Sequence, residues 1–575
     1  MAARLTALIV VTIVAVTVIA GLIVGAQRDD YSGPIDLIVF DAKVFPADGT
    51  APFEGAVAIR GNQILRVGRS REVRRLRRPQ TVEIDARGGA LLPGFNDAHL
   101  HLLRAGLAMD RANLLGATTQ PAIEAAIAAF ASAHPDRPWV LGHGWDYGAF
   151  PGGLPARDLR DRVVPDRPAL MTARDGHTSW VNSRALALAG ITRRTPNPAN
   201  GTIAKDPRTG EPTGALREGA QELVRRHLPD VTRDERRIAL RRAIAEAHRY
   251  GITSVQNASG SADEFELYDE LRRAHDLHLR VYSAVSIDAS LDETRLAELE
   301  ALRAKYPDDA LFKTGAVKLM DDGTIAARTA AMLAPYASPS ESAPPPATAG
   351  EALRRAVTML DARGWQVMIH AAGDAAVRQA LDAFEAAART NPAPARGRRH
   401  RVEHVEIVDA ADLPRFDALG AIASMQPGHG TPDPVRIDGW AASLGPERAA
   451  RGWACASIAG AGGRLAFGSG WPAAALDPRL GLNAAVNRVT PDGTPHGGWH
   501  PEQRLTLARA LEAYTSGAAY ASFDEHRKGR IAPGMLADLV LLSKDIFELP
   551  ADRLLDAVVT HTIFDGRVVY ERPET

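Results

Sequence analysis

Hydrophobic residues follow different patterns in successive parts of this 575-residue chain. Residues 5–26 form one uncharged apolar run, whereas apolar residues between 35 and 92 occur in short alternating segments such as 36–40 and 63–67. Short alternating segments separated by turns are typical of β-strands. Residues 35–92 therefore predict a small β-sheet domain, and similar short strands return near the carboxyl terminus.

In the second half of the chain, strand-like segments alternate with helical ones. The predicted strands lie at 252–256, 279–285, 315–320, 366–370, 401–404, 421–426 and 465–469. Repeated strand–helix units of this length indicate an α/β fold with a parallel sheet, and their number favours a closed (β/α)8 TIM-like barrel. An open doubly wound sheet is the alternative, but no glycine-rich dinucleotide fingerprint follows the early strands.

These patterns divide the chain into several predicted parts. We expect a signal anchor or signal peptide at 1–27, the first part of a β-sandwich at 35–92, the barrel at 93–520 and the second part of the sandwich at 521–575. An insertion at about 105–250 interrupts the barrel after its first strand. The two terminal β segments are expected to pair into one small domain beside the barrel.

The amino-terminal apolar run is long enough to cross a bilayer, which requires roughly 20 apolar residues. Arg4 before the run suits a cytoplasmic amino end, and Ala26 ends a group of small residues of the kind that precedes signal cleavage. Because the run exceeds the usual length of a signal core, we favour an uncleaved anchor over a cleaved peptide. The body of the protein is then expected outside the cytoplasm, anchored to the membrane, or secreted if the segment is cleaved.

The charge balance bears on the expected partners. Lys and Arg total 68 and Asp and Glu total 69, so the formal net charge is −1. This balance gives no basis for a nucleic-acid partner, because nucleic-acid-binding domains are usually strongly basic. The single cysteine, Cys455, excludes an intrachain disulfide. We expect a small-molecule substrate and, through the amino-terminal segment, a membrane as partners.

Candidate metal ligands gather at the predicted strand ends. His99 and His101 are two residues apart, so both side chains point to the same face if the segment is a strand. His370 and His404 end two later strands, and Lys318 lies within another. Because catalytic groups of a barrel lie at the carboxyl ends of its strands, four imidazoles there suit one or two divalent ions such as Zn²⁺.

Lys318 stands in an apolar strand, where a charged ammonium is unfavourable unless it is neutralised or paired. Reaction with CO₂ would convert it into an anionic oxygen ligand able to bridge two metal ions. The alternative is an ordinary buried ion pair for Lys318 and a hydrogen-bonded core position for each histidine. Four histidines at strand ends of one barrel favour the metal site over this alternative.

These residues belong to motifs that resemble the amidohydrolase superfamily, specifically its amidohydrolase-3 (YtcJ-like) group. The motifs lie at 92–101, 175–183, 317–323, 370–374, 401–404, 424–429 and 529–540. The resemblance implies metal ligands at His99, His101, His370 and His404, and a carboxylated bridging lysine at Lys318. The residues that it implies for the substrate pocket are Trp145, His177, Gln426 and His429.

One position departs from the family pattern. The family has Gly-Ser-Asp-x-Pro after the last barrel strand, whereas this chain has Gly468, Ser469, Gly470, Trp471 and Pro472. Gly470 therefore replaces the aspartate that the resemblance implies as metal ligand and proton shuttle. A general acid–base group contributes about 10²–10⁴-fold in rate, and glycine supplies no such group.

The resemblance implies a metal-dependent hydrolase of a non-peptide C–N bond, such as an amide, N-acyl or cyclic amide group. In this hypothesis His404 or His370 assists attack by an activated water. Gly470 supports a second hypothesis, a membrane-anchored pseudoenzyme that binds metal or ligand without turnover. A third hypothesis is that Gly470 is an introduced substitution in an otherwise active enzyme.

Overall fold

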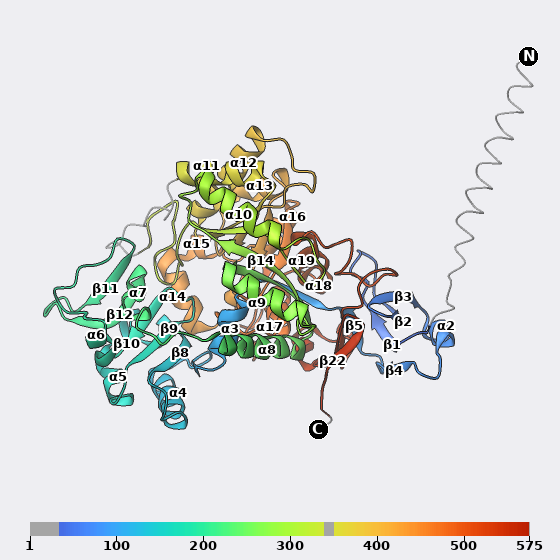
Figure 1. Cartoon of the computed structure of the whole chain (residues 1–575), viewed down its shortest axis with the longest axis horizontal. Helices are drawn as coiled ribbons and strands as arrows, with labels where there is room; N and C mark the ends of the chain where they lie inside the picture. Colours follow the sequence, from blue (N-terminus) through green and yellow to red (C-terminus); the bar gives the residue numbers. More distant parts are fainter. Residues whose placement is uncertain (1–33, 338–349, 574–575) are drawn as a thin grey trace, which may run out of the picture.

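The computed structural model describes residues 34–337 and 350–573, and their strands form a parallel barrel sheet and two further sheets. Figure 1 shows the barrel in the middle, with the insertion that carries β8–β12 on one side and the β domain that carries β1–β4 on the other. The barrel strands are β6 (Phe95–Leu100), β13 (Ile252–Gly260), β14 (Arg280–Ser286), β15 (Phe312–Met320), β16 (Gln366–Ala371), β17 (Arg401–His404), β18 (Ile422–Met425) and β19 (Arg464–Phe467).

Every neighbouring pair along this sheet is parallel, from β6 through β13 to β19. The sheet is completed by the segment that follows β19 and runs back to β6. The Gly470 amide donates to the His99 carbonyl at 2.7 Å, and the His101 amide donates to the Trp471 carbonyl at 2.9 Å. The predicted TIM-like barrel is therefore confirmed, and the open doubly wound alternative is wrong because the first and last strands meet.

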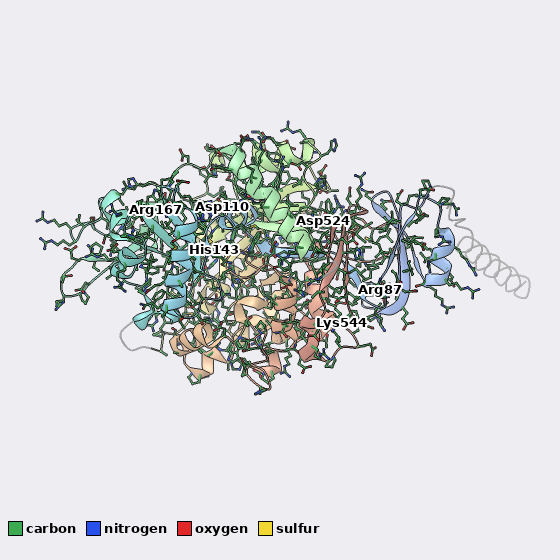
Figure 2. The ribbon with its side chains drawn as sticks, turned by 90° about the horizontal axis from the view of Figure 1, so that it is seen from below. Arg87, Asp110, His143, Arg167, Asp524 and Lys544 are labelled. Atoms are coloured by element: carbon green, nitrogen blue, oxygen red, sulfur yellow. The ribbon has the colours of Figure 1, made fainter. Side chains whose placement is uncertain are left out.

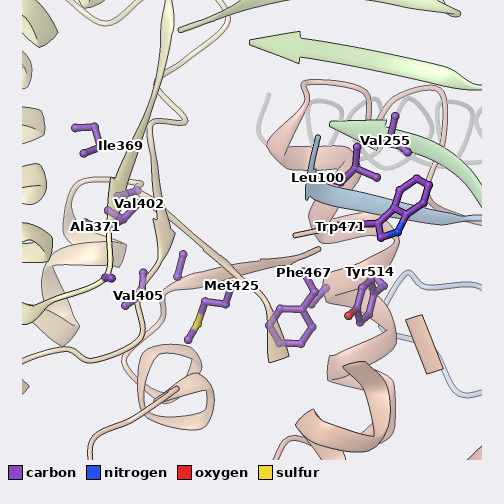
Figure 3. Close-up of a cluster of buried hydrophobic side chains, with 14 of the residues drawn as sticks. Leu100, Val255, Ile369, Ala371, Val402, Val405, Met425, Phe467, Trp471 and Tyr514 are labelled. Atoms are coloured by element: carbon purple, nitrogen blue, oxygen red, sulfur yellow. The ribbon is translucent and has the colours of Figure 1, made fainter. Parts of the chain in front are cut away.

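Helices on the outside of the barrel cover its strands with apolar faces. They include α9 (Ala262–Arg273), α10 (Glu293–Lys305), α11 (Gly350–Ala362), α12 (Asp374–Thr390), α13 (Leu413–Ala418) and α18 (Leu507–Tyr514). Near the closing seam, the rings of Phe467 and Tyr514 meet edge to face with centroids 5.5 Å apart. Figure 3 shows these two rings, with Trp471 beside Leu100 and Val255, in the buried cluster that underlies the seam.

Strands from both ends of the chain build the small β domain. They are β1 (Leu37–Val44), β2 (Phe53–Arg60), β3 (Gln63–Gly68), β4 (Val82–Asp85), β5 (Ala90–Pro93), β20 (Leu539–Leu542), β21 (Val559–Phe564) and β22 (Arg567–Glu571). Hydrogen bonds link the strands of both terminal segments, and β20 pairs with β5, so the two segments pair with each other. At a bulge between Val39 and Ala42, β1 changes its parallel partner, pairing with β4 before the bulge and with β5 after it.

A buried ion pair ties the β domain to the barrel. Arg280 at the start of β14 donates to both carboxylate oxygens of Asp538 at 2.5 and 2.9 Å, and to Asp565 at 2.8 Å. Arg280 and Asp538 are both buried. Removing one member of such a pair would leave an uncompensated buried charge. Because Arg280 and Asp538 stay paired only when the β domain packs against the barrel, the contact holds the two in this arrangement.

The insertion leaves the barrel after α3 (Leu102–Ala108) and returns through α8 (Arg233–Arg249). Thr232 and Glu235 form a capping box that starts α8. Its sheet contains β7 (Ala112–Asn113), β8 (Val140–Trp145), β9 (Ala169–Ala173), β10 (Thr178–Val181), β11 (Gly201–Lys205) and β12 (Pro212–Glu218). Helices α4 (Gln120–Ala133), α5 (Arg157–Val163) and α7 (Glu222–Arg225) pack in the same region. Figure 2 shows Asp110 and His143 on the insertion side, far from Arg87 and Lys544 of the β domain.

The predicted membrane anchor at 1–27 lies outside the described residues. Among the helices of residues 34–337 and 350–573, none has both the length and the apolar character needed to cross a bilayer.

Candidate active site

The barrel brings the predicted ligands together at the carboxyl ends of its strands. His99 lies near the end of β6 and His101 directly follows it, while His404 is the last residue of β17. Ring centroids are 4.6 Å apart for His99 and His404, 4.4 Å for His370 and His404, and 5.6 Å for His99 and His101. Lys318 lies in β15 and lines the same cavity as the four histidines.

Each of these imidazoles has one ring nitrogen held by another protein group. Nδ1 of His101 is hydrogen-bonded to Oγ of Ser259 at 2.7 Å, and Nδ1 of His404 to Oε1 of Gln426 at 2.7 Å.

The other two rings are held in the same way. Nδ1 of His99 contacts the Glu403 carboxylate, and Nε2 of His370 donates to the Gly323 carbonyl at 2.8 Å. The second nitrogen of each of the four rings has no hydrogen bond to a described residue and is left to a ligand. Histidines that bind metals characteristically have their other nitrogen fixed by a carboxylate, a carbonyl or an amide, which sets the tautomer.

Burial keeps these imidazoles in the neutral form that can bind a metal. Desolvation, followed by the charge of Lys318, holds the pKa of His99 and of His370 well below the usual value. Burial also lowers the pKa of Lys318 to about 8, against the opposing effect of Glu403. A neutral amine is the form of lysine that can react with CO₂.

The donor chemistry of this cluster suits a divalent ion, but its side chains are not arranged as a finished site. Among the residues that the structure describes, no group of three or more His, Cys, Asp or Glu side chains is placed to hold a metal ion as it stands. Neutral imidazoles with fixed outer nitrogens, together with a buried lysine, nevertheless match the ligand types that Zn²⁺ accepts. The residues therefore fit the metal by their chemistry, and Gly470 leaves one position of the family's set without a donor.

Gly470 lies at the barrel seam, and the imidazole of His429 fills the space beside it. Gly470 has a positive φ of +70°, and a Cβ atom there would lie 2.6 Å from Nε2 and 2.9 Å from Cε1 of His429. Nε2 of His429 is 3.1 Å from the Ser469 carbonyl. Burial, with a smaller effect of Arg174, lowers the pKa of His429 to about 3, so the ring is neutral. A neutral imidazole thus occupies the region into which a side chain at 470 would extend.

The cavity in front of the histidines has a volume of about 330 Å³, which suits a small molecule. His177 and His429 line it, as predicted for the pocket. Gln426 lies behind His404 instead, where its Oε1 is hydrogen-bonded to His404 and its side chain is buried. Gln426 therefore orients a histidine rather than lining the cavity.

Trp145 also lies away from the cavity. Its indole donates to the Met171 carbonyl at 3.0 Å and packs against Tyr147 and Phe150 inside the insertion. Alternate residues of a strand face opposite sides, so Trp145 at the end of β8 points into the core. The neighbouring Asp146 and Tyr147 reach the cavity instead.

The insertion supplies one wall of the cavity through a set of hydrogen-bonded side chains. Asp175 accepts from the Tyr147 hydroxyl at 3.1 Å, from Thr324 at 2.9 Å and from the His177 amide at 2.9 Å. The His177 imidazole pairs with Glu218 at 2.9 Å. Although burial opposes it, the bond to Glu218 raises the pKa of His177 above its ordinary value.

The sequence motifs do not single out several residues of the site. Glu403, which holds His99, is one residue of the motif at 401–404. Other lining residues come from segments far apart in sequence and include Arg104, Arg174, Glu406, Trp440 and Trp453. Only for Glu403 did the sequence carry a signal, because it directly precedes His404 in a buried strand.

Comparison with known proteins identifies the relatives of this chain. The profile of the amidohydrolase family (Amidohydro_3) matches residues 82–570. YtcJ of Bacillus subtilis is 31% identical over 86% of this chain and 91% of its own length. An N-substituted formamide deformylase of Arthrobacter pascens is 27% identical over 93% of this chain and 98% of its own length.

A solved structure shares the fold. It is described as an uncharacterized metal-dependent hydrolase from Pyrococcus horikoshii, and it aligns with a TM-score of 0.68 and 23% identity. The alignment covers 90% of this chain and 99% of that one. The barrel and the β domain are thus a known combination, and the predicted relationship to YtcJ is confirmed.

Proposed function

Because this chain belongs to the amidohydrolase family, we propose that it is a metal-dependent hydrolase of a C–N bond in a small non-peptide molecule, such as an amide, N-acyl or cyclic amide group. The observation that carries the proposal is the group of four imidazoles at the strand ends, each with its outer nitrogen held by another protein group. Such fixation supports ligation. The similarity to a protein named N-substituted formamide deformylase supports an N-acyl substrate.

The residues of the site would have different roles, which follow from their positions. His99, His101, His370, His404 and Lys318 would hold one or two divalent ions, Zn²⁺ being the ion best suited to these ligands. When bound, a divalent ion would polarise a carbonyl and supply a nucleophile at neutral pH.

The rest of the site binds and orients the substrate. Tyr147, Trp440 and Trp453 would contact apolar parts of the substrate, and His177, held by Glu218, would present its remaining ring nitrogen to it. A positioned donor of this kind stabilises charge that develops on a carbonyl oxygen. The family's aspartate is absent at position 470, so whichever of His404 and His370 keeps a ring nitrogen off the metal is the group that we expect to assist proton transfer.

A second function is favoured by the environment of Gly470. The position of the expected acid–base group carries no side chain, and His429 fills the space beside it. The chain would then be a pseudoenzyme that binds metal or ligand without turnover. Attachment to a membrane through the amino-terminal segment is proposed for either function, on the basis of the apolar run at 5–26.

The two proposed functions predict different activities for the metal-loaded protein: a hydrolase turns over its substrate, and a pseudoenzyme does not. The full chain is purified, its metal content is measured by mass spectrometry, and hydrolysis of a panel of formamides and N-acyl amines is followed by amine release. A hydrolase is expected to lose activity with a chelator and regain it with Zn²⁺. His101→Ala is expected to lower the metal content, whereas His227→Ala, at an exposed position of the insertion, is its matched control.

The possible results separate the proposals. Stoichiometric metal without turnover supports the pseudoenzyme. Less than about one equivalent of metal after incubation with Zn²⁺ contradicts the ligand set, and with it both functions.

A further inference from the structure

Arg104 is a cation that lines the cavity. It lies in α3, three residues after His101, and its side chain is exposed within the cavity. It forms no hydrogen bond and no ion pair with any residue that the structure describes. A guanidinium has five donors, and those of Arg104 are open to a ligand in the cavity.

The other charged groups of the cavity wall have partners. Arg174 donates to the Ala473 carbonyl at 2.7 Å and lies 3.9 Å from Asp146. Asp175 accepts the three hydrogen bonds described above.

Glu406 accepts from the Trp440 indole at 2.9 Å, and burial raises its pKa to about 7. Apart from Lys318, which the proposed function places at the metal, Arg104 is the cation of the described wall whose charge is left unpaired.

The surroundings of Arg104 make room for it and add to its positive potential. A Cβ at Gly176 would lie 2.6 Å from Nη2 of Arg104, and Gly176 has a φ of +85°. Glycine at this turn therefore leaves the space that the guanidinium occupies. Arg111 and Arg225 lie close enough for their charges to interact with one another and with Arg104. The Asp175 carboxylate also interacts with the charge of Arg104, but the two groups form no ion pair. Arg225 is held by Gln221 at 2.8 Å. Three positive charges this close together raise the positive potential at the neighbouring cavity wall, which favours binding of an anion there.

We propose that Arg104 binds a carboxylate of the substrate, so that the substrate is an N-acyl amino acid rather than a neutral amide. This inference rests on the proposed function, whose substrate it specifies. Residues three apart on a helix share one face, with Cβ atoms about 5–6 Å apart. The carboxylate subsite thus begins one helical turn from His101, which suits a carboxylate a few bonds from the acyl nitrogen. Planar bidentate pairing with a carboxylate is the interaction that arginine makes best.

The aromatic part of the wall indicates the rest of the molecule. Tyr147, Trp440 and Trp453 line the cavity together with Arg104. Aromatic walls bury apolar side chains with a large gain in contact area. N-formylphenylalanine and its carboxamide are therefore suitable probes, because they differ only in the group that Arg104 would bind, a charged carboxylate or a neutral amide.

Binding of the two probes to the zinc-loaded full chain is measured by calorimetry, and their hydrolysis by amine release. We expect the carboxylate to bind at least about 10-fold more tightly than the carboxamide, as for a charge-assisted pair. Arg104→Met is expected to reduce this ratio below about 3-fold, chiefly by weakening the carboxylate, and Arg104→Lys to retain part of it. Arg355→Met removes the same charge from an exposed position of α11 and should leave the ratio unchanged.

The outcomes separate this inference from the proposed function. A carboxylate preference that depends on Arg104 but occurs without turnover supports the subsite and counts against the hydrolase. Hydrolysis of both probes with equal kcat/KM overturns the subsite and leaves the hydrolase in place.

Three further results would overturn the subsite. The first is a preference for the carboxylate probe that stays unchanged in Arg104→Met, when this variant has a normal circular dichroism spectrum. The second is that neither probe binds. The third is that inorganic phosphate binds to the protein but displaces neither probe.

Discussion

Replacing Gly470 tests whether His429 occupies the space of the missing side chain. The left-handed φ of +70° disfavours an L-residue by about 1–2 kcal/mol. The contact of 2.6 Å with Nε2 of His429 forces the ring to move, and its hydrogen bond to the Ser469 carbonyl contributes about 1 kcal/mol. Gly470→Ala is therefore expected to lower the free energy of unfolding by about 2–3 kcal/mol.

The assay is urea unfolding of the metal-free protein, followed by tryptophan fluorescence, for the wild type, Gly470→Ala, His429→Ala and the double variant. If the ring and the new Cβ share one space, the double variant is less destabilised than the sum of the single variants by about 1–2 kcal/mol. If the destabilisations of the two single variants add up to that of the double variant within about 0.5 kcal/mol, the steric reasoning is refuted. Effects of substitutions at sites that do not contact each other are additive within that limit.

A second set of variants, with aspartate instead of alanine at position 470, tests catalysis. Gly470→Asp alone is expected to gain little activity, because its carboxylate and the His429 ring compete for one space. Gly470→Asp combined with His429→Ala has room for the carboxylate, and a gain toward 10²-fold or more is the usual scale for an acid–base group. An equal gain in the single variant would show that the ring moves aside freely.

Other predictions concern Lys318, the buried histidine His248 and the tie between barrel and β domain. Lys318→Ala is expected to lower the zinc content measured by mass spectrometry, and unchanged content would make Lys318 an ordinary buried lysine. Burial lowers the pKa of His248 to about 4 in the folded protein, so the unfolded state binds its proton first and stability falls as the pH drops from about 6.5 toward 4, by up to about 3 kcal/mol. His248→Gln should weaken this dependence of the thermal midpoint on pH, and the exposed His227→Gln should not. Arg280→Met leaves the Asp538 carboxylate buried without its cation and should lower the free energy of urea unfolding by about 3–5 kcal/mol, whereas breaking the exposed ion pair of Arg233 should change it by less than about 1 kcal/mol. Equal effects of Arg280→Met and Arg233→Met would contradict the role of burial.

The extent of the sequence prediction differs between the barrel and the cavity wall. Strand ends follow from the alternation of apolar segments and helices, so the positions of His99, His370 and His404 could be assigned before the fold was known. Trp145 shows the limit of this reasoning. A shift of one residue along a strand turns a side chain to the opposite face, and the sequence pattern does not fix which face of a short strand the barrel covers.

Arg104, His429 and Gln426 show what depends on contacts between distant segments. Gln426 is 22 residues from His404, and the insertion brings Gly176 against Arg104. Such contacts arise when the barrel closes and the insertion folds over its mouth, and they have no local periodicity in the sequence.

The sequence by itself was enough to predict the family and the barrel and to name candidate ligands, because motifs, periodicity and residue type are local properties. It also exposed Gly470 as the position without an acid–base group. The tertiary structure alone decided that His429 fills the space beside Gly470 and that Arg104 faces the cavity with no ion pair to any described residue. Both facts depend on which side chains from distant segments meet in space.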